Sequence, residues 1–534
     1  YNTAVGLCSQ NSVTTASSNV SIGANSLRDN VTGTANTALG HASLLVNTAS
    51  NNTAAGWLSL SANTSGANNT GIGVQSLAAN TTGTPNVAVG NFSLCANTTG
   101  ASNTGVGFCA LRNNTEGDSN TGFGRGASQT NATGDDNTAV GRNALINSTT
   151  SDNTAVGSCA LTTNSTGSRN TSVGSCSLKA NTTGVNNTSS GYNSMGLNTE
   201  GTRNSAYGYS ALGSNTTGNC NTAIGCGSLN SNTTASNNTA LGSDSLKFNT
   251  TGTGNVAIGE SAASKQTDAS NNVAVGRDSL LCNISGGNNT AVGDLALEMN
   301  TANKNTAMGN QALEGNTTGE CNVGFGFCAG HLMTTGGNNA AFGSFSLQSN
   351  TTASNNTAVG TCALFANTTG ASNVAVGHTA LDANTTGSYI TAIGQCALGA
   401  NTTGTENVAV GQGSLQNNTT ASYNVAVGVS ALLTNTTGAC NTSVGHCALC
   451  SNTTANENTA VGFQALKANT TGIRNVSIGR CSLPTNTTGC CNVVMGSRAG
   501  CLNTTGDYNT VVGGGALATN TTANDNVAVG AFAL

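Results

Sequence analysis

The chain has 534 residues and a net charge of −5, and only 7% of its residues are charged and 4% aromatic. The few charged residues form no basic stripe, and hardly any aromatic residues lie between the Lys and Arg residues. Nucleic acid is therefore not expected as a partner. The sequence contains no run of about 20 apolar residues, and no membrane span is predicted.

A motif of 17 residues, N-T-A-V-G-x-x-A-L-x-x-N-T-T-G-x-x, is repeated through the whole chain. Its central glycine occurs thirty-two times from Gly6 to Gly530, at intervals of 17 residues except for three of 16, which end at Gly56, Gly157 and Gly309. Such a short, uninterrupted period is typical of a solenoid, in which each repeat forms one turn. We therefore predict an all-β fold, a single β-solenoid (β-roll or β-helix) of about 32 turns over residues 1–534, with its handedness left open.

The residues of one turn are numbered from the central glycine, which is position 0. Asn occupies position −4 in every turn but that of Ile390, a large apolar residue occupies −1 in thirty turns, and Leu occupies +4 in twenty-six. This pattern predicts two short strands per turn, N-T-A-V and x-A-L-x, with Gly and Asn-Thr corners. We expect interior ladders of the −1 and +4 side chains and a ladder of Asn amides at −4. The central glycine is expected to need a positive φ or the absence of a Cβ.

The motif also resembles a known family. The segments Asn137-Thr138-Ala139-Val140-Gly141 and Ala144-Leu145 resemble the head repeats of trimeric autotransporter adhesins, and the N-T-A-V-G…N-T-T-G arrays of tail-fibre-like surface proteins. The resemblance covers the whole chain and implies a β-roll at a cell or virion surface. The repeat here is longer than the adhesin unit by residues around N-T-T-G, so trimerisation and handedness are not carried over.

The Asn at position +7 begins an N-x-S/T triplet in most turns, and two interpretations of it are open. It predicts a row of N-glycans in a secreted eukaryotic or viral protein, but Asn-Thr-Thr is also a good corner by itself. The candidate glycosylation sites are Asn80, Asn97, Asn181, Asn215, Asn249, Asn316, Asn367, Asn401, Asn435 and Asn469.

Nineteen cysteines indicate an oxidising location, extracellular or at a cell or virion surface. Cys159 and Cys176 occupy the same position in adjacent turns, which predicts a disulfide between them. The four histidines are scattered over distant turns, and Cys447-Ala448-Leu449-Cys450 has no second pair at zinc spacing. We therefore expect no catalytic residues, no metal site and no cofactor, and no enzyme activity.

Three functions are compatible with the repeat. The first is a structural subunit of an extracellular fibre or filament that binds copies of itself, end to end or side by side. Its first and last turns are incomplete and expose strand edges, which favours end-to-end contact. The second is an adhesin or viral tail-fibre-type rod that binds glycans or a cell-surface receptor. The third is an ice-binding solenoid, which would need a regular T-x-T face. The dispersed aromatic residues favour the first.

Overall fold

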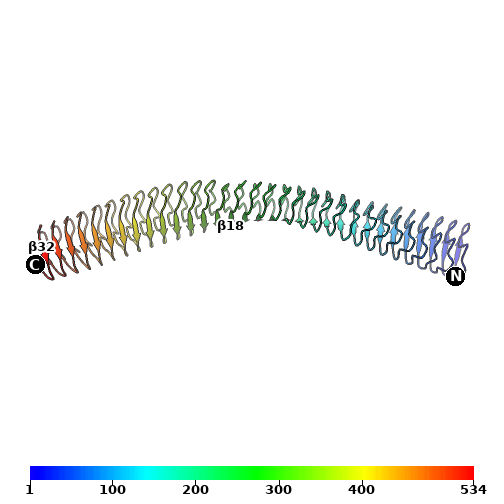
Figure 1. The fold of residues 1–534 in the computed structure, drawn as a ribbon, viewed down its shortest axis with the longest axis horizontal. Helices are drawn as coiled ribbons and strands as arrows, with labels where there is room; N and C mark the ends of the chain where they lie inside the picture. Colours follow the sequence, from blue (N-terminus) through cyan, green and yellow to red (C-terminus); the bar gives the residue numbers. More distant parts are fainter. The chain divides into compact units, whose positions relative to one another are not determined.

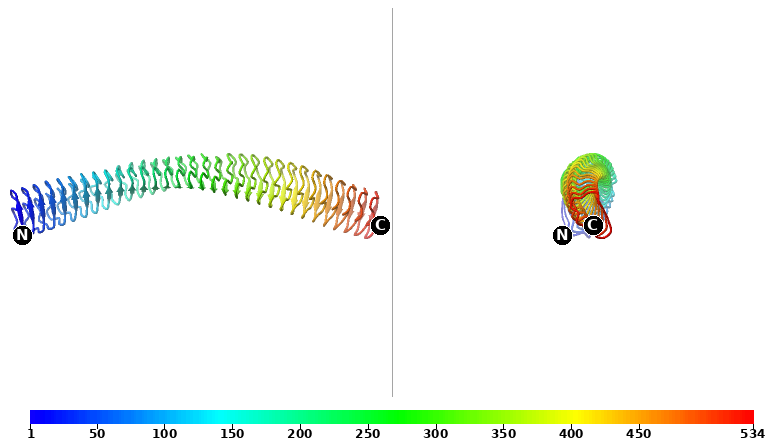
Figure 2. Two further views of the ribbon diagram at one scale, coloured as in Figure 1. Left: turned by 180° about the vertical axis from the view of Figure 1, so that it is seen from behind. Right: turned by 90° about the vertical axis from the view of Figure 1, so that its left-hand side faces the viewer.

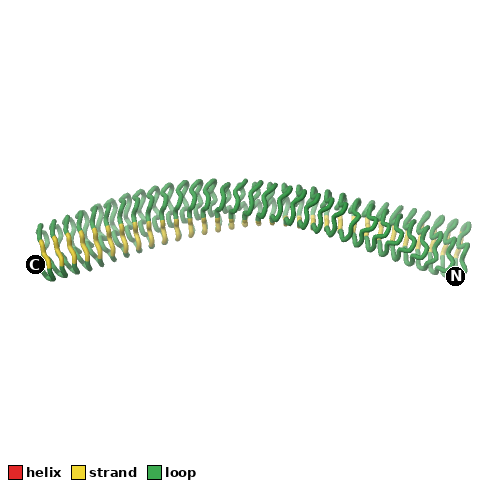
Figure 3. Tube along the Cα trace, viewed as in Figure 1, coloured by secondary structure: helices red, strands yellow, loops and turns green.

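The computed structural model describes residues 1–534 as two compact units, Tyr1–Ser270 and Asn271–Leu534. Both units contain strands and turns and no helix (Figure 3). Each turn contributes one strand of three residues, at positions −3 to −1, and the rest of the turn is loop. The predicted all-β class is therefore confirmed.

Unit 1 contains sixteen strands: β1 (Thr3–Val5), β2 (Val20–Ile22), β3 (Thr37–Leu39), β4 (Thr53–Ala55), β5 (Thr70–Ile72), β6 (Val87–Val89), β7 (Thr104–Val106), β8 (Thr121–Phe123), β9 (Thr138–Val140), β10 (Thr154–Val156), β11 (Thr171–Val173), β12 (Thr188–Ser190), β13 (Ser205–Tyr207), β14 (Thr222–Ile224), β15 (Thr239–Leu241) and β16 (Val256–Ile258). Unit 2 contains sixteen more: β17 (Val273–Val275), β18 (Thr290–Val292), β19 (Thr306–Met308), β20 (Val323–Phe325), β21 (Ala340–Phe342), β22 (Thr357–Val359), β23 (Val374–Val376), β24 (Thr391–Ile393), β25 (Val408–Val410), β26 (Val425–Val427), β27 (Thr442–Val444), β28 (Thr459–Val461), β29 (Val476–Ile478), β30 (Val493–Met495), β31 (Thr510–Val512) and β32 (Val527–Val529).

Within each unit, every strand pairs in parallel with the strand of the next turn. Equivalent positions are always opposite one another, as for Val89 and Val106 between β6 and β7. The register is kept across a shortened turn, where Thr138 of β9 lies opposite Thr154 of β10, so the missing residue is taken from the loop. Figures 1 and 2 show the strands of each unit stacked turn upon turn. Each unit is thus a parallel β-solenoid with one turn per 17 residues.

The second predicted strand, x-A-L-x, does not form. Positions +2 and +4 have left-handed backbones, with φ of +59° at Phe92 and +49° at Leu94, and this alternation is incompatible with an extended strand. The segment still bonds between turns, because the N–H of Leu77 donates to the carbonyl of Ser93 at 3.0 Å. Backbone pairing therefore continues through a region that has no strand geometry.

The interior of a turn is narrow, and this corrects the predicted core. Leu at +4 is buried as expected, as at Leu94 and Leu111. The −1 side chains point outward, however, and the buried strand position is Ala at −2, as at Ala88. Successive strand residues face opposite sides, so only one of the two positions can face inward. The space there is narrow, since a Cβ added at Gly105 would lie 2.6 Å from Oγ of Ser93, and the largest residues that occupy this position are the buried Val494 and Val511 of unit 2.

The central glycines are required on two counts, as predicted. Gly107 has a φ of +134°, a conformation that residues with a side chain rarely adopt. A Cβ there would also lie 2.6 Å from the carbonyl oxygen of Gly124 in the next turn. The same geometry recurs from turn to turn within each unit, which explains why this position never varies.

Candidate functional site: the apolar stripe

The outward-facing residues at position −1 form a row along the sheet of each unit, which we call the apolar stripe. In unit 1 it consists of Val5, Ile22, Leu39, Ala55, Ile72, Val89, Val106, Phe123, Val140, Val156, Val173, Ser190, Tyr207, Ile224, Leu241 and Ile258. In unit 2 it consists of Val275, Val292, Met308, Phe325, Phe342, Val359, Val376, Ile393, Val410, Val427, Val444, Val461, Ile478, Met495, Val512 and Val529.

The stripe is well exposed to solvent. Ile72 is 42% exposed and Phe123 is 56% exposed. Neighbouring members touch along the row, since the rings of Phe325 and Phe342 stack with centroids 5.2 Å apart. Because the strands are in register, the row repeats at the strand spacing of about 4.8 Å. Each unit therefore presents an apolar row with a fixed period, which Ser190 interrupts in unit 1.

No charged residue lies on this face of the sheet. The other outward position of each strand, −3, holds only Thr, Val, Ser or Ala, and every charged residue of the chain lies in the loops between strands. The solvent-facing side of a half-exposed sheet ordinarily carries polar side chains. A long apolar surface without charged residues is typical of an interaction site.

The ten candidate glycosylation asparagines lie on the inside of their turns. Each is fully buried, and its Nδ2 donates two hydrogen bonds, one to Oδ1 of the +7 Asn in the preceding turn and one to the carbonyl of its own +10 residue. For Asn97 these bonds reach Asn80 at 2.8 Å and Gly100 at 2.9 Å. An amide nitrogen has only two N–H groups, so both are used. A glycan on Nδ2 would displace this ladder.

A second amide ladder is formed by the asparagines at −4, as predicted. Oδ1 of Asn86 accepts the backbone N–H of Asn103 in the next turn at 2.9 Å, and Nδ2 of Asn86 donates to the carbonyl of Gly100 at 2.8 Å. The same carbonyl oxygen also accepts a hydrogen bond from Nδ2 of Asn97, so it connects the two ladders. These bonds satisfy polar groups that a buried corner would otherwise leave unpaired.

The predicted disulfide between Cys159 and Cys176 is absent, and all nineteen cysteines are free thiols in the structure. The two residues do occupy stacked positions, since the N–H of Cys176 donates to the carbonyl of Ser158, next to Cys159, at 3.0 Å. Parallel side chains in register lie about 4.8 Å apart at Cβ, beyond the roughly 3.8 Å that a disulfide needs. Stacking alone therefore does not bring the sulfurs together.

The Cys447–Cys450 segment contributes no ligand cluster. No group of three or more His, Cys, Asp or Glu side chains that could hold a metal ion is found, and the ring of neighbouring His446 stacks on Phe463 with centroids 5.4 Å apart. Burial raises the pKa of the Cys450 thiol above its ordinary value. This thiol is therefore kept protonated rather than prepared as a ligand or nucleophile.

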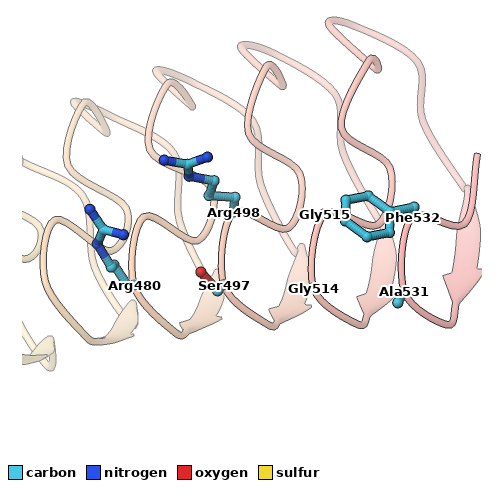
Figure 4. A pocket seen from close by; sticks show the side chains of 7 residues that line it. All are labelled: Arg480, Ser497, Arg498, Gly514, Gly515, Ala531 and Phe532. Atoms are coloured by element: carbon cyan, nitrogen blue, oxygen red, sulfur yellow. The ribbon is translucent and has the colours of Figure 1, made fainter.

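Two hollows in the loop surface lie beside a glycine at position +2. In unit 2, Arg480, Arg498 and Phe532 surround a hollow of about 470 Å³ beside Gly514 and Gly515, and the Phe532 ring lies over Gly515 (Figure 4). In unit 1, a hollow of about 390 Å³ lies over Gly126. The sequence does not predict these hollows, and the only signal is a glycine at a position that usually carries a side chain.

The fold defines a class, the parallel β-solenoid repeat proteins, with 17 residues per turn and about 31 turns. No protein-family model and no curated protein matches the chain. No helix that could span a membrane is found.

Proposed function

We propose that the chain is a non-enzymatic structural subunit of an extracellular fibre or filament, and that it binds other copies of itself side by side through the apolar stripe. The observation that carries the proposal is the outward sheet face, on which all thirty-two strands lack a charged residue. The resemblance of the repeat to adhesin heads and tail-fibre arrays supports a location at a cell or virion surface.

The energy of such an association favours a long contact. Burying one half-exposed Val or Ile side chain contributes about 1 kcal/mol. Association costs roughly 4–15 kcal/mol in lost freedom of motion, so a contact of a few turns is too weak. The burial of the sixteen stripe residues of one unit contributes more than that cost. The stripe therefore favours partners that follow it over many turns.

A second copy of this chain is the partner that fits best. It carries the same apolar row at the same period of about 4.8 Å, so its side chains meet the first row in register over any number of turns. A partner with another spacing would match only locally. Lateral association needs no glycan and no disulfide, and end-to-end contact between copies remains a separate expectation.

The alternative function is a receptor-binding rod of adhesin or tail-fibre type. It is favoured by pairs of exposed aromatic residues in neighbouring turns of the loop surface, such as Tyr192 and Tyr209, whose rings stack with centroids 5.6 Å apart. Ice binding has less support, because the outward strand face combines Thr or Val at −3 with an apolar residue at −1 instead of a T-x-T pattern.

The test compares two triple variants that add the same charges to the same three turns. The first places Lys in the stripe, at Val376, Val410 and Val444, and the second places Lys in the adjoining loop, at His378, Gln412 and His446. All six side chains lie outside the buried core. Sedimentation equilibrium should show the stripe variant at the single-chain mass of 52.3 kDa while the loop variant assembles like the wild type. Equal behaviour of the two variants would contradict the proposal.

A further inference from the structure

The hollow over Gly126 arises because one side chain is missing from the loop surface. Other turns of unit 1 carry side chains such as Cys109 and Asn143 at this position, with the same left-handed backbone. Gly126 also has a left-handed φ, of +67°, so the backbone of the turn is unchanged and a space remains where the side chain would lie. The result is a hollow of about 390 Å³, a volume that suits a small ligand.

Two side-chain amides converge on this space. A Cβ at Gly126 would lie 2.9 Å from Oδ1 of Asn143 and 3.4 Å from Oε1 of Gln129. Neither side-chain amide has a hydrogen-bond partner within the protein. Each amide offers both N–H donors and a carbonyl acceptor, a combination that suits the hydroxyl groups of a sugar.

Two guanidinium groups line the same hollow without a carboxylate partner. Arg112 is held by an aromatic pair, since its guanidinium lies 5.4 Å from the ring centre of Phe92, whose ring meets that of Phe108 edge to face. Arg125 forms no ion pair, and Arg142 occupies the same position in the next turn, so two positive side chains adjoin. A bound anion would supply the partner that the guanidinium groups of Arg112 and Arg125 lack.

We propose that the hollow over Gly126 binds an acidic saccharide, a sugar that carries a carboxylate or a sulfate group. Arg112 and Arg125 pair with the anionic group, the amides of Gln129 and Asn143 bond to the hydroxyls, and Phe108 contacts the apolar face of the ring. Guanidinium groups match planar carboxylates and sulfate oxygens with paired N–H donors. The site lies on the loop surface and adds a ligand to the proposed structural role.

The test is calorimetric titration of the full chain with a glucuronate-containing disaccharide, a sulfated disaccharide and a neutral disaccharide of the same size. The acidic sugars should bind and the neutral sugar should bind at least about tenfold more weakly, because only the acidic sugars accept charge-assisted hydrogen bonds from the guanidinium groups. Arg125→Gln should weaken the acidic sugars by a similar factor. Because Arg125 is exposed, this variant is expected to fold.

Gly126→Asn fills the hollow with a residue that position +2 accepts in other turns, and it should abolish binding. Gly413→Asn is the matched control, because Gly413 also occupies +2 and adjoins Gln416, but no arginine lines that place. Binding that survives Gly126→Asn, or the absence of binding by both acidic sugars, would overturn the site. Inorganic sulfate that competes as well as the sulfated disaccharide would overturn the saccharide assignment.

Discussion

Oδ1 of Asn373 accepts the backbone N–H of Ile390 at 3.0 Å, but Ile390 has no amide oxygen to offer the N–H of Asn407 in the following turn. The ladder at position −4 is therefore interrupted at this one turn, where a buried apolar side chain stands in its place. Elsewhere in each unit, the ladder links neighbouring turns at the same corner.

We predict that Ile390→Asn stabilises unit 2 by about 1 kcal/mol, because it restores a buried hydrogen bond to Asn407 and adds an amide donor at the corner. We expect the restored hydrogen bonds to outweigh the lost apolar contact of Ile390, since every other turn has Asn at this position. The midpoint of urea unfolding, with hydrogen exchange at Asn407, measures it. A lower midpoint together with unchanged exchange at Asn407 would contradict the explanation.

A second prediction compares two Gly→Ala changes in unit 1. Gly107→Ala should cost about 3 kcal/mol or more, because Ala would need a φ of +134° and its Cβ would meet the carbonyl of Gly124.

Gly100→Ala is the control for that change. It should cost clearly less, about 1–2 kcal/mol, because Gly100 has no left-handed φ; its Cβ would lie 2.5 Å from the carbonyl oxygen of Gly117, but buried Ala235 and Ala353 occupy the same position in other turns. Unfolding curves of both variants decide the question. Equal losses in the free energy of unfolding would mean that the positive φ of the central glycine does not make it harder to replace than Gly100.

A third prediction concerns the +7 ladder. Asn97→Asp removes both donors and places a carboxylate against the amide oxygen of Asn80, so it should destabilise unit 1 by about 2–4 kcal/mol. Asn91→Asp is the control, because Asn91 is exposed and only accepts a bond, from the N–H of Val74 at 3.0 Å. We also expect intact-mass and peptide mass spectrometry of the native protein to find Asn97 without a glycan. A glycan there, on folded protein, would contradict the ladder.

The sequence allowed the turn length, the role of the central glycine, the Leu ladder and the −4 amide ladder to be predicted, because each follows from one residue type at a fixed phase. The −1 position was predicted wrongly, because apolar character alone does not distinguish an inward from an outward strand residue. Variation was the better signal: Ala88 stands at a position that holds mainly Ala, Ser and Gly, whereas −1 accepts anything from Val89 to Phe123. A confined interior position tolerates little change in volume.

The +7 asparagines show a different limit. A triplet such as Asn97-Thr98-Thr99 is compatible with both a glycan and a buried corner, and only the fold decides which way the amide points. The hollow over Gly126 could not be predicted from the sequence, because it forms where Gln129 and Asn143 of the next turn come together. Linear spacing does not indicate that side chains at +5 and +2 of neighbouring turns share one space.

We infer that copies of the chain associate side by side through the apolar stripe. The most direct test of this association is the mass per unit length of the native assembly, measured by scanning transmission electron microscopy. We predict a value at least twice that of a single chain for the wild type, and the single-chain value for the variant with Lys at Val376, Val410 and Val444. A single-chain value for the wild type, or a doubled value for the variant, would contradict the account.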